Sequence, residues 1–481
     1  MTNDTLQPEP TENLPATSKQ EENNPTNILK VRDDVKPVFF VNSENSDTKA
    51  SFTLKEGQSV SWLGNKEEFG HKELRSRIEP WLTALFQSEH LSLLAGSGLM
   101  HAVHHIAAGC SAAGMNKIPF ATQGEKIDAA AALSSKAAKR EEGNIEDQLR
   151  VANELLRGLE ILEDPQAEPL KKELETGMQA FAESILQSET GIAQADSKDR
   201  EKAFNTLVTF LMSFASRTGV RDRLNIFTTN YDRLIEAGAE LAGIHLMDRF
   251  LGNLMPVFRS SRLDLDMHYS TPGIRGEPRY LEGVARFTKL HGSVDWLQVD
   301  HDIRRMGLPF GAPSITPFLQ ASGATTSAAH KLMIYPNAAK DQETANYPYV
   351  ELFRDLAAAI CQPNSTLVTY GYSFGDEHIN RVIRDMLTIP STHLVIISRD
   401  DPMGRIMGIY ESLGRNSQIS LLIGPALADI TNLTKYYLPK SAIDKTTSRM
   451  SDLLKQRFVS NEQSPAPSPA SIAGDFEVSF K

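Results

Sequence analysis

The chain has 481 residues, of which 40% are apolar, enough for one large domain with insertions or for two to three ordinary domains. Its formal net charge of −11 argues against a chain that binds nucleic acid over its whole surface, because phosphate contacts need clustered Lys and Arg. The only two cysteines, Cys110 and Cys361, exclude a disulfide scaffold and a four-cysteine zinc site. There is no apolar run of about 18 residues and no secretory leader, so we expect a cytoplasmic protein without a membrane span.

Both ends of the chain are predicted to be flexible. Residues 1–27 are rich in Thr, Asn, Pro, Glu and Gln, and such a segment buries too little apolar surface to become ordered. Residues 28–71 alternate apolar and polar side chains, which predicts a short β-rich arm. Residues 441–481 are expected to form a C-terminal helix and a flexible tail. The alternating pattern of residues 474–481 fits either a docking strand or a frayed end.

Residues 72–440 are predicted to form one α/β domain. It opens with a helix-like stretch from Glu73 to Phe86, interrupted or restarted at Pro80, and then a strand at Leu91–Leu94, a glycine turn and a helix. Apolar residues at helical spacing predict a helical insertion over about 121–220. Residues 121–202 carry 18 acidic and 11 basic side chains, so one face of this insertion is solvated and acidic. Its position favours a lid or an oligomer contact.

From about residue 221 onward, strand-like and helix-like segments alternate. The strand-like segments are nearly continuous apolar and β-branched runs, which is typical of parallel strands buried on both faces. They read L-N-I-F-T-T-N, A-R-F-T-K-L, S-T-L-V-T-Y, H-L-V-I-I-S and I-S-L-L-I-G. The sequence therefore predicts a Rossmann-like, doubly wound parallel sheet with a large helical insertion and flexible termini.

Ligands of a doubly wound sheet bind beyond the carboxyl ends of its strands, so the residues that follow each predicted strand are the candidate site. Five strand ends carry small or polar residues. These are Ala95, Gly96, Ser97 and Gly98; Thr228, Thr229, Asn230, Tyr231 and Asp232; His291, Gly292 and Ser293; Gly371, Tyr372, Ser373, Phe374, Gly375 and Asp376; and Ser398, Arg399 and Asp400.

Each of these elements also has a purely structural interpretation. Gly96-x-Gly98 either approaches a pyrophosphate or makes a tight turn, and Asn230 with Asp232 either serves the site or caps the next helix. His291 is either a site residue or a satisfied loop histidine. Asp376 fits the N-cap of the following helix, in which Asn380 could face the crevice. Trp296 and Phe374 fit the core or a pocket wall.

Taken together and in this order, the motifs resemble the sirtuin family and its bacterial defence-associated relatives. The T-T-N-Y-D at 228–232 is similar to the family's T-Q-N-I-D, and the L-H-G-S at 290–293 contains its catalytic H-G. The G-Y-S-F-G-D-E-H-I-N at 371–380 is similar to a motif of the bacterial relatives. The glycine motif at 96–100 is a partial match, with Met100 where the family has Ser. The resemblance covers about 88–110 and 221–425.

One departure from the family affects the expected activity. Sirtuin deacylases carry a zinc module with four cysteines, and the segment between Asn230 and His291 contains no cysteine. The relatives without this module are mostly NAD⁺ glycohydrolases of anti-phage systems, some of which pair with a HerA-type translocase ATPase. The resemblance therefore implies an NAD⁺ glycohydrolase with NAD⁺ as its substrate and no metal. Because an uncontrolled NAD⁺ hydrolase would kill its host, we also expect a homo-oligomer. Because the chain has no Walker A motif, a HerA-type partner would be a separate chain.

The resemblance also implies roles for the site residues. Asn230 would hold the attacking water or the ribose hydroxyls, His291 would act as general base, and Asp232 would orient the nicotinamide. Ser373 and the Gly96 loop would hold the phosphates, and Ser398 and Asp400 the adenosine ribose. His101 and His105 share a helix face but form an incomplete zinc site. The alternatives are a silent subunit that binds NAD⁺ or ADP-ribose, a deacylase and an ADP-ribosyltransferase.

Overall fold

The computed structural model describes residues 25–43, 51–113, 117–137, 145–216, 221–260, 267–269, 279–321, 332–334 and 347–440. Its centre is a mixed sheet in which the seven strands from β18 to β7 run parallel, in the order β18-β17-β16-β5-β6-β12-β7. The bounds are β5 (His90–Ala95), β6 (Asn225–Thr228), β7 (His245–Met247), β12 (Val284–Lys289), β16 (Ser365–Tyr370), β17 (His393–Ser398) and β18 (Ile419–Ile423).

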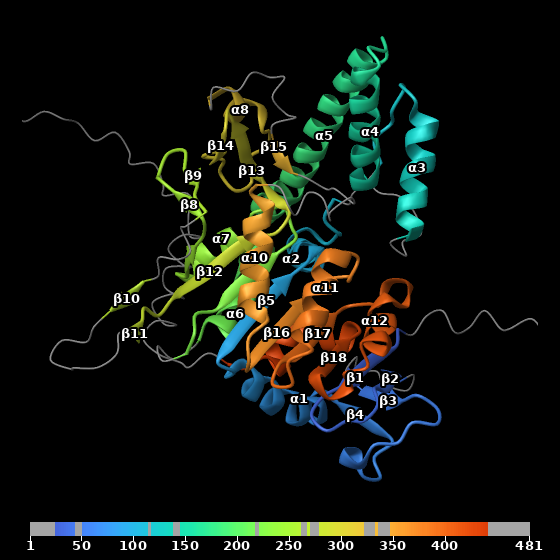
Figure 1. Ribbon diagram of the computed structural model, residues 1–481. Helices are drawn as coiled ribbons and strands as arrows, with labels where there is room; N and C mark the ends of the chain where they lie inside the picture. The colour runs from blue at the N-terminus through green and yellow to red at the C-terminus, as the bar shows by residue number, and fades with distance from the viewer. Residues whose placement is uncertain are drawn as a thin grey trace, which may run out of the picture.

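This strand order is that of a doubly wound fold. Numbered along the chain without β7, the strands from β12 to β18 follow the Rossmann order 3-2-1-4-5-6. The order reverses between β5 and β16, and Figure 1 shows these two strands side by side in the middle of the sheet. The predicted α/β class and doubly wound parallel sheet are confirmed.

Four antiparallel strands extend the sheet beyond β18. They are β1 (Asn27–Lys30), β2 (Val38–Asn42), β3 (Ser51–Leu54) and β4 (Glu68–Gly70). β1 pairs with β18, and β2, β3 and β4 follow in order. The Lys30 ammonium group is buried and donates to the carbonyl of Ile419 at 2.9 Å, so a side chain as well as the backbone joins the two strands. The predicted β-rich arm is thus part of the main sheet.

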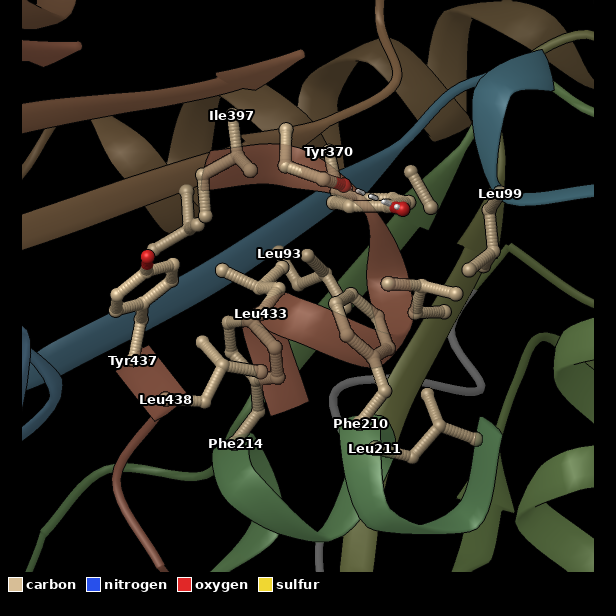
Figure 2. Close-up of a cluster of buried hydrophobic side chains, with 14 of the residues drawn as sticks. Leu93, Leu99, Phe210, Leu211, Phe214, Tyr370, Ile397, Leu433, Tyr437 and Leu438 are labelled. Carbon is tan, nitrogen blue, oxygen red and sulfur yellow. Dashed lines mark hydrogen bonds between the residues drawn. The ribbon is translucent and has the colours of Figure 1, made fainter. Parts of the chain in front are cut away.

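Alternate residues of the buried strands face two different apolar layers. One layer contains α1 (His71–Phe86), α2 (Ser97–Ala108), α6 (Ser197–Ala215), α7 (Leu234–Ala242) and the C-terminal turns α13 (Pro425–Ala428), α14 (Ile430–Asn432) and η7 (Leu433–Tyr437). Figure 2 shows its centre, where Phe210 and Phe214 of α6 pack toward Leu93 and Tyr370 of the sheet. The opposite layer contains α10 (Tyr349–Ile360), α11 (Glu377–Met386) and α12 (Arg405–Leu413). Both faces of the parallel strands are covered, which explains their continuous apolar sequences.

The helical insertion is present, and a second sheet packs against it. Its helices α3 (Gly124–Ala137), α4 (Ile145–Ile161) and α5 (Ala167–Ala193) lie apart from the main sheet in Figure 1. A third apolar cluster joins α3, α4 and α5 to the second sheet, whose strand order is β15-β13-β14-β9-β8. Its elements are β8 (Phe250–Leu251), β9 (Val257–Phe258), β13 (Gly292–Val299), β14 (Asp302–Arg305) and β15 (Leu332–Ile334); α8 (Thr316–Ala321) and the pair β10 (His268–Tyr269) and β11 (Arg279–Tyr280) lie nearby in the chain.

The predicted interruption of the first helix at Pro80 is wrong, because α1 runs unbroken from His71 to Phe86. A proline inside a helix lacks the N–H that would bond the carbonyl four residues earlier, which here is that of Ser76. The side chain of Arg32 donates to the carbonyls of Ser76 at 3.3 Å and Arg77 at 3.1 Å. A partner from outside the helix therefore satisfies the carbonyl that Pro80 leaves without its usual donor.

The second sheet was not predicted from the sequence. The tail predicted at residues 1–27 was taken too long, because Asn27 is a buried residue of β1. Residues 1–24 of that tail and the predicted C-terminal helix and tail at 441–481 lie outside the described residues. Among the helices that the structure describes, none combines the length and the apolar character needed to cross a membrane.

Candidate functional site

The ends of the parallel strands lie level with one another. Ala95 of β5 pairs with Tyr370 of β16 on one side and with Thr228 of β6 on the other, and Thr228 pairs with Lys289 of β12. Ile397 of β17 continues the row beside Tyr370. The residues that follow these strands therefore share one edge of the sheet, which includes the point where the strand order reverses.

Three glycines bring the loops after β5 and β16 into close contact at this edge. Gly371 has a φ of +60°, and a Cβ built on it would lie 2.6 Å from the Cα of Gly98. A Cβ on Gly96 would lie 2.5 Å from the carbonyl oxygen of Gly371. The N–H of Gly98 donates to that same carbonyl at 3.1 Å. The glycines are thus required by contact between two loops, and the Gly98 N–H already has a protein partner.

Asn230 is held against the glycine loop. Its side-chain amide donates to the carbonyl of Gly96 at 3.1 Å, and its backbone N–H donates to the Thr228 hydroxyl at 3.0 Å. The Thr228 hydroxyl donates in turn to the carbonyl of Ala95 at 2.9 Å, and the Thr229 N–H donates to the same carbonyl at 3.3 Å. Thr228 therefore fixes the turn that carries Asn230, and the ends of β5 and β6 are joined by hydrogen bonds.

Asp232 and a buried lysine lie on the far side of this turn. An Asp232 carboxylate oxygen accepts the N–H of Leu234, the first residue of α7, at 3.0 Å, although the N-cap position of that helix is taken by Arg233. The Lys289 ammonium group donates to the Asp232 carbonyl and to the Glu236 carboxylate, the latter at 3.0 Å. Burial raises the pKa values of the Asp232 and Glu236 carboxyls, and Lys289 opposes both shifts. Lys289 is a site neighbour that the sequence did not identify.

His291 lies between two strands, because β12 ends at Lys289 and β13 begins at Gly292. It is only 6% exposed. Its Nε2 atom lies 3.4 Å from the Nε2 of His378, and the ring centroids of His291 and Tyr231 are 6.3 Å apart. His291 is therefore a buried residue of the site edge, and His378, which the sequence did not single out, lies beside it.

The loop after β16 divides its residues between the core and the site. Tyr372 is buried in the apolar layer that contains α10, α11 and α12, and its hydroxyl contacts the Asn380 amide oxygen at 3.3 Å. Asn380 donates to the carbonyl of Phe374 at 3.0 Å, and Phe374 has a φ of +56°. Asn380 therefore holds this loop in shape rather than facing the crevice. Asp376 stands at the N-cap position of α11, where its side chain makes no capping bond within the described structure.

The remaining candidate residues differ in exposure. Ser97 is exposed, Ser373 is half-buried, and Ser398 is buried with its carbonyl accepting the Gly424 N–H at 2.9 Å. Asp400 is exposed and interacts electrostatically with His101, whose pKa is lowered mainly by burial. Arg405, which was not among the predicted site residues, lies close to the 371–376 loop. Its Nη1 would be 3.2 Å from a Cβ built on Gly375.

The helical insertion contacts the loop that carries Asn230 at two residues. The Tyr231 hydroxyl donates to the Glu146 carboxylate of α4 at 2.9 Å. The backbone N–H and the guanidinium group of Arg233 donate to the Glu189 carboxylate of α5, the N–H at 2.8 Å. The predicted ligand contact Tyr231 is thus bonded to α4 of the insertion and lies beside the ring of His291.

Residues 224–414 match the family model of the SIR2-like domain. The match begins one residue before β6 and ends one residue after α12, so it contains Asn230, Asp232, His291 and the 371–376 loop but not Gly96. It supports a sirtuin-like domain, and SIR2-like domains use NAD as a substrate. No curated protein matches the chain.

Proposed function

We propose that this protein is an NAD⁺ glycohydrolase that cleaves NAD⁺ to nicotinamide and ADP-ribose. The observation that carries the proposal is the register of β6 and β12. Thr228 of β6 pairs with Lys289 of β12. Asn230 comes two residues after Thr228, and His291 comes two residues after Lys289, so both lie just beyond the ends of neighbouring strands. The two residue types that the reaction needs, a polar amide and a potential base, are therefore delivered together beside the point where the strand order reverses.

The binding edge suits a dinucleotide diphosphate. Helix α2 begins at Ser97 directly after β5, and its first turn contains no acidic residue, so its positive end is not neutralised there. Arg405 supplies a cation beside the 373–375 loop. We assign the phosphates to the start of α2 and this loop, with Ser373 and Arg405 as side-chain contacts, and the adenosine ribose to Ser398 and Asp400.

The chemical step requires one water molecule. Its oxygen bonds to the anomeric carbon of the ribose, the bond to nicotinamide breaks, and nicotinamide leaves as a neutral molecule while one proton is released. His291 accepts that proton as general base. The Asn230 NH₂ group is held by Gly96, which fixes the amide with its oxygen as the acceptor for a ribose hydroxyl or the water. Asp232 would orient the nicotinamide side.

The decisive experiment incubates the purified full chain with NAD⁺ and quantifies nicotinamide and ADP-ribose by chromatography. We expect equal amounts of both products. Tight binding of NAD⁺ without products would identify a silent nucleotide-binding subunit instead. Release of nicotinamide that depends on an added acyl-lysine peptide would identify a deacylase. The absence of binding and of products, in a folded sample, would refute the proposal.

We further propose that the enzyme acts as an anti-phage effector that depletes NAD⁺ only after activation. An unregulated NAD⁺ hydrolase would kill its host, and the bonds from Glu146 and Glu189 to the Asn230 loop give the helical insertion a direct means of control. A homo-oligomer, alone or on a separate HerA-type translocase, would provide the trigger. Light scattering that finds a monomer under all conditions, including with such a partner, would contradict the assembly.

A further inference from the structure

Two histidines and one aspartate from two separate segments of the chain meet next to the Asn230 loop. His291 follows β12, Asp376 stands at the N-cap of α11, and His378 lies in the first turn of that helix. One ligand atom from each of the three side chains lies within 4.8 Å of the other two. In the part of the chain that the structure describes, this is the one group of three His, Cys, Asp or Glu side chains at metal-binding distances.

The spacing of the two imidazoles fits a shared metal ion. Their Nε2 atoms are 3.4 Å apart, whereas N–H hydrogen bonds most often measure about 2.9–3.0 Å. Two nitrogens bound to one tetrahedral ion at about 2.0–2.1 Å are separated by roughly 3.4 Å. Octahedral ligands at 90° would be closer, at roughly 2.9 Å for the same bond lengths. The observed separation is compatible with both imidazoles binding one tetrahedral ion.

We propose that His291, Asp376 and His378 bind one divalent transition-metal ion, with Zn²⁺ as the best fit. Imidazole nitrogens and a carboxylate oxygen are the ligands of catalytic-type zinc sites, which keep a fourth position open. A carboxylate oxygen of Asp376 lies within 4.8 Å of the histidine ligand atoms. Rotation about the Asp376 side-chain bonds would bring this oxygen to the metal. These ligands are two histidines and one aspartate, so the proposed site differs from the four-cysteine zinc module of sirtuin deacylases.

The surroundings keep both rings in place. The ring of Phe353 packs edge-on against His378, with centroids 4.7 Å apart. His291 is fixed between two strands, and the backbone carbonyl of Asp376 accepts the N–H groups of Ile379 at 3.1 Å and Asn380 at 3.0 Å. Ligands on fixed elements lose little freedom when a metal binds, so affinity depends mainly on all three being present.

The consequence for catalysis rests on the proposed function, whereas metal binding itself does not. A metal ion on the Nε2 of His291 would occupy the electron pair that accepts a proton from water. The metal-bound enzyme should therefore be unable to hydrolyse NAD⁺, and a chelator should restore activity. The metal would act as an inhibitor that competes for the general base.

The test measures binding directly, without NAD⁺. Full-length protein stripped with EDTA is dialysed against Zn²⁺, and bound metal is quantified by mass spectrometry; Co²⁺ is then added as a probe whose visible bands intensify in tetrahedral sites. The variants are His291→Gln, His378→Gln and Asp376→Asn, the last of which keeps a good N-cap residue. His105→Gln, an exposed histidine of α2, is the matched control.

We expect one Zn²⁺ per chain, intense Co²⁺ bands, a loss of affinity of roughly tenfold or more in each site variant, and no change in the control. Folding of every variant is checked by thermal melts. Sub-stoichiometric binding, or binding unaffected by the three substitutions, would overturn the site. If the metal binds but inhibition is absent, only the catalytic consequence fails; if no NAD⁺ hydrolysis occurs with or without metal, the proposed function fails and the binding result stands.

Discussion

Glu189 and Arg233 form a buried ion pair that joins helix α5 to the loop carrying Asn230. The Glu189 side chain is fully buried and that of Arg233 is 6% exposed. One carboxylate oxygen accepts both the backbone N–H of Arg233, at 2.8 Å, and its Nε, at 3.1 Å. Burial raises the pKa of the Glu189 carboxyl and Arg233 opposes this shift, so the loop and the insertion are held together by charge in an enclosed environment.

Replacing Glu189 by Gln should destabilise the fold strongly. The substitution leaves the buried guanidinium without its counter-charge, which typically costs about 3–5 kcal/mol. Denaturant unfolding should show this loss, whereas Glu201→Gln, an exposed change on α6, should stay within about 0.5 kcal/mol of wild type. Unchanged stability of Glu189→Gln would mean that the ion pair between Glu189 and Arg233 does not form in solution.

Replacing His291 should reduce NAD⁺ hydrolysis by about 10²–10⁴-fold, because the general base is lost. Asn230→Ala should be at least as damaging, since it removes both the substrate contact and the bond to Gly96. Because His291 is 6% exposed, His291→Gln is preferred over Ala, which would leave a cavity. Nicotinamide release is measured together with NAD⁺-induced shifts in melting temperature. Wild-type turnover by folded His291→Gln would refute the assigned mechanism.

Gly371→Ala should disrupt the contact between the loops after β5 and β16. The new methyl group would require a left-handed backbone, which costs about 1–2 kcal/mol, and would overlap the Cα of Gly98 at 2.6 Å. We expect a total loss of at least about 2 kcal/mol and weaker NAD⁺ binding. Gly408→Ala is the control, because this position in α12 has no atom within 4 Å of its Cβ, and alanine there should stabilise by about 0.5–1 kcal/mol.

His393 should make the protein less stable at acid pH. Burial, reinforced by the charge of Lys30, lowers the pKa of His393 from 6.5 to about 4. Its Nε2 contacts the Ser420 hydroxyl at 2.8 Å, which also accepts the Trp81 indole N–H at 2.9 Å. Between these pKa values the unfolded chain binds the proton and the folded chain does not, so stability falls as the pH drops from 6.5 to 4.

The loss of folding free energy caused by His393 is complete below pH 4, where it amounts to about 3 kcal/mol. Denaturant unfolding at a series of pH values should therefore give a flatter profile for His393→Gln than for wild type. The exposed His301→Gln serves as the matched control for loss of a histidine. Parallel profiles for wild type and His393→Gln would show that burial does not keep this imidazole neutral.

The main sheet could be predicted because its strands are continuous apolar runs, and the edge that carries the candidate site follows from their direction. The second sheet could not, because its strands β8 and β9 have only two residues each and β9 pairs with β14, some 45 residues later in the chain. Such short strands carry no periodic pattern, and their pairing depends on tertiary contacts.

The structure adds to the candidate site several contacts that the sequence did not indicate. Asn230 and His291 could be placed because they follow adjacent strands, whereas the burial of Tyr372 and Tyr231 depends on helices that approach from elsewhere in the chain. His378 sits in a sequence that indicates only a helix start, yet it lies 3.4 Å from His291. The signal that could have identified it was its place within the G-Y-S-F-G-D-E-H-I-N motif itself.

The antiparallel strands beyond β18 also bear on how copies of the chain can associate. They move one margin of the main sheet from β18 to β4, and β7 forms the other margin; both have three residues. Strands this short offer a poor template for another chain to add a strand, which is a common protection against runaway aggregation. Pairing of two copies of the chain through these sheet margins is therefore disfavoured.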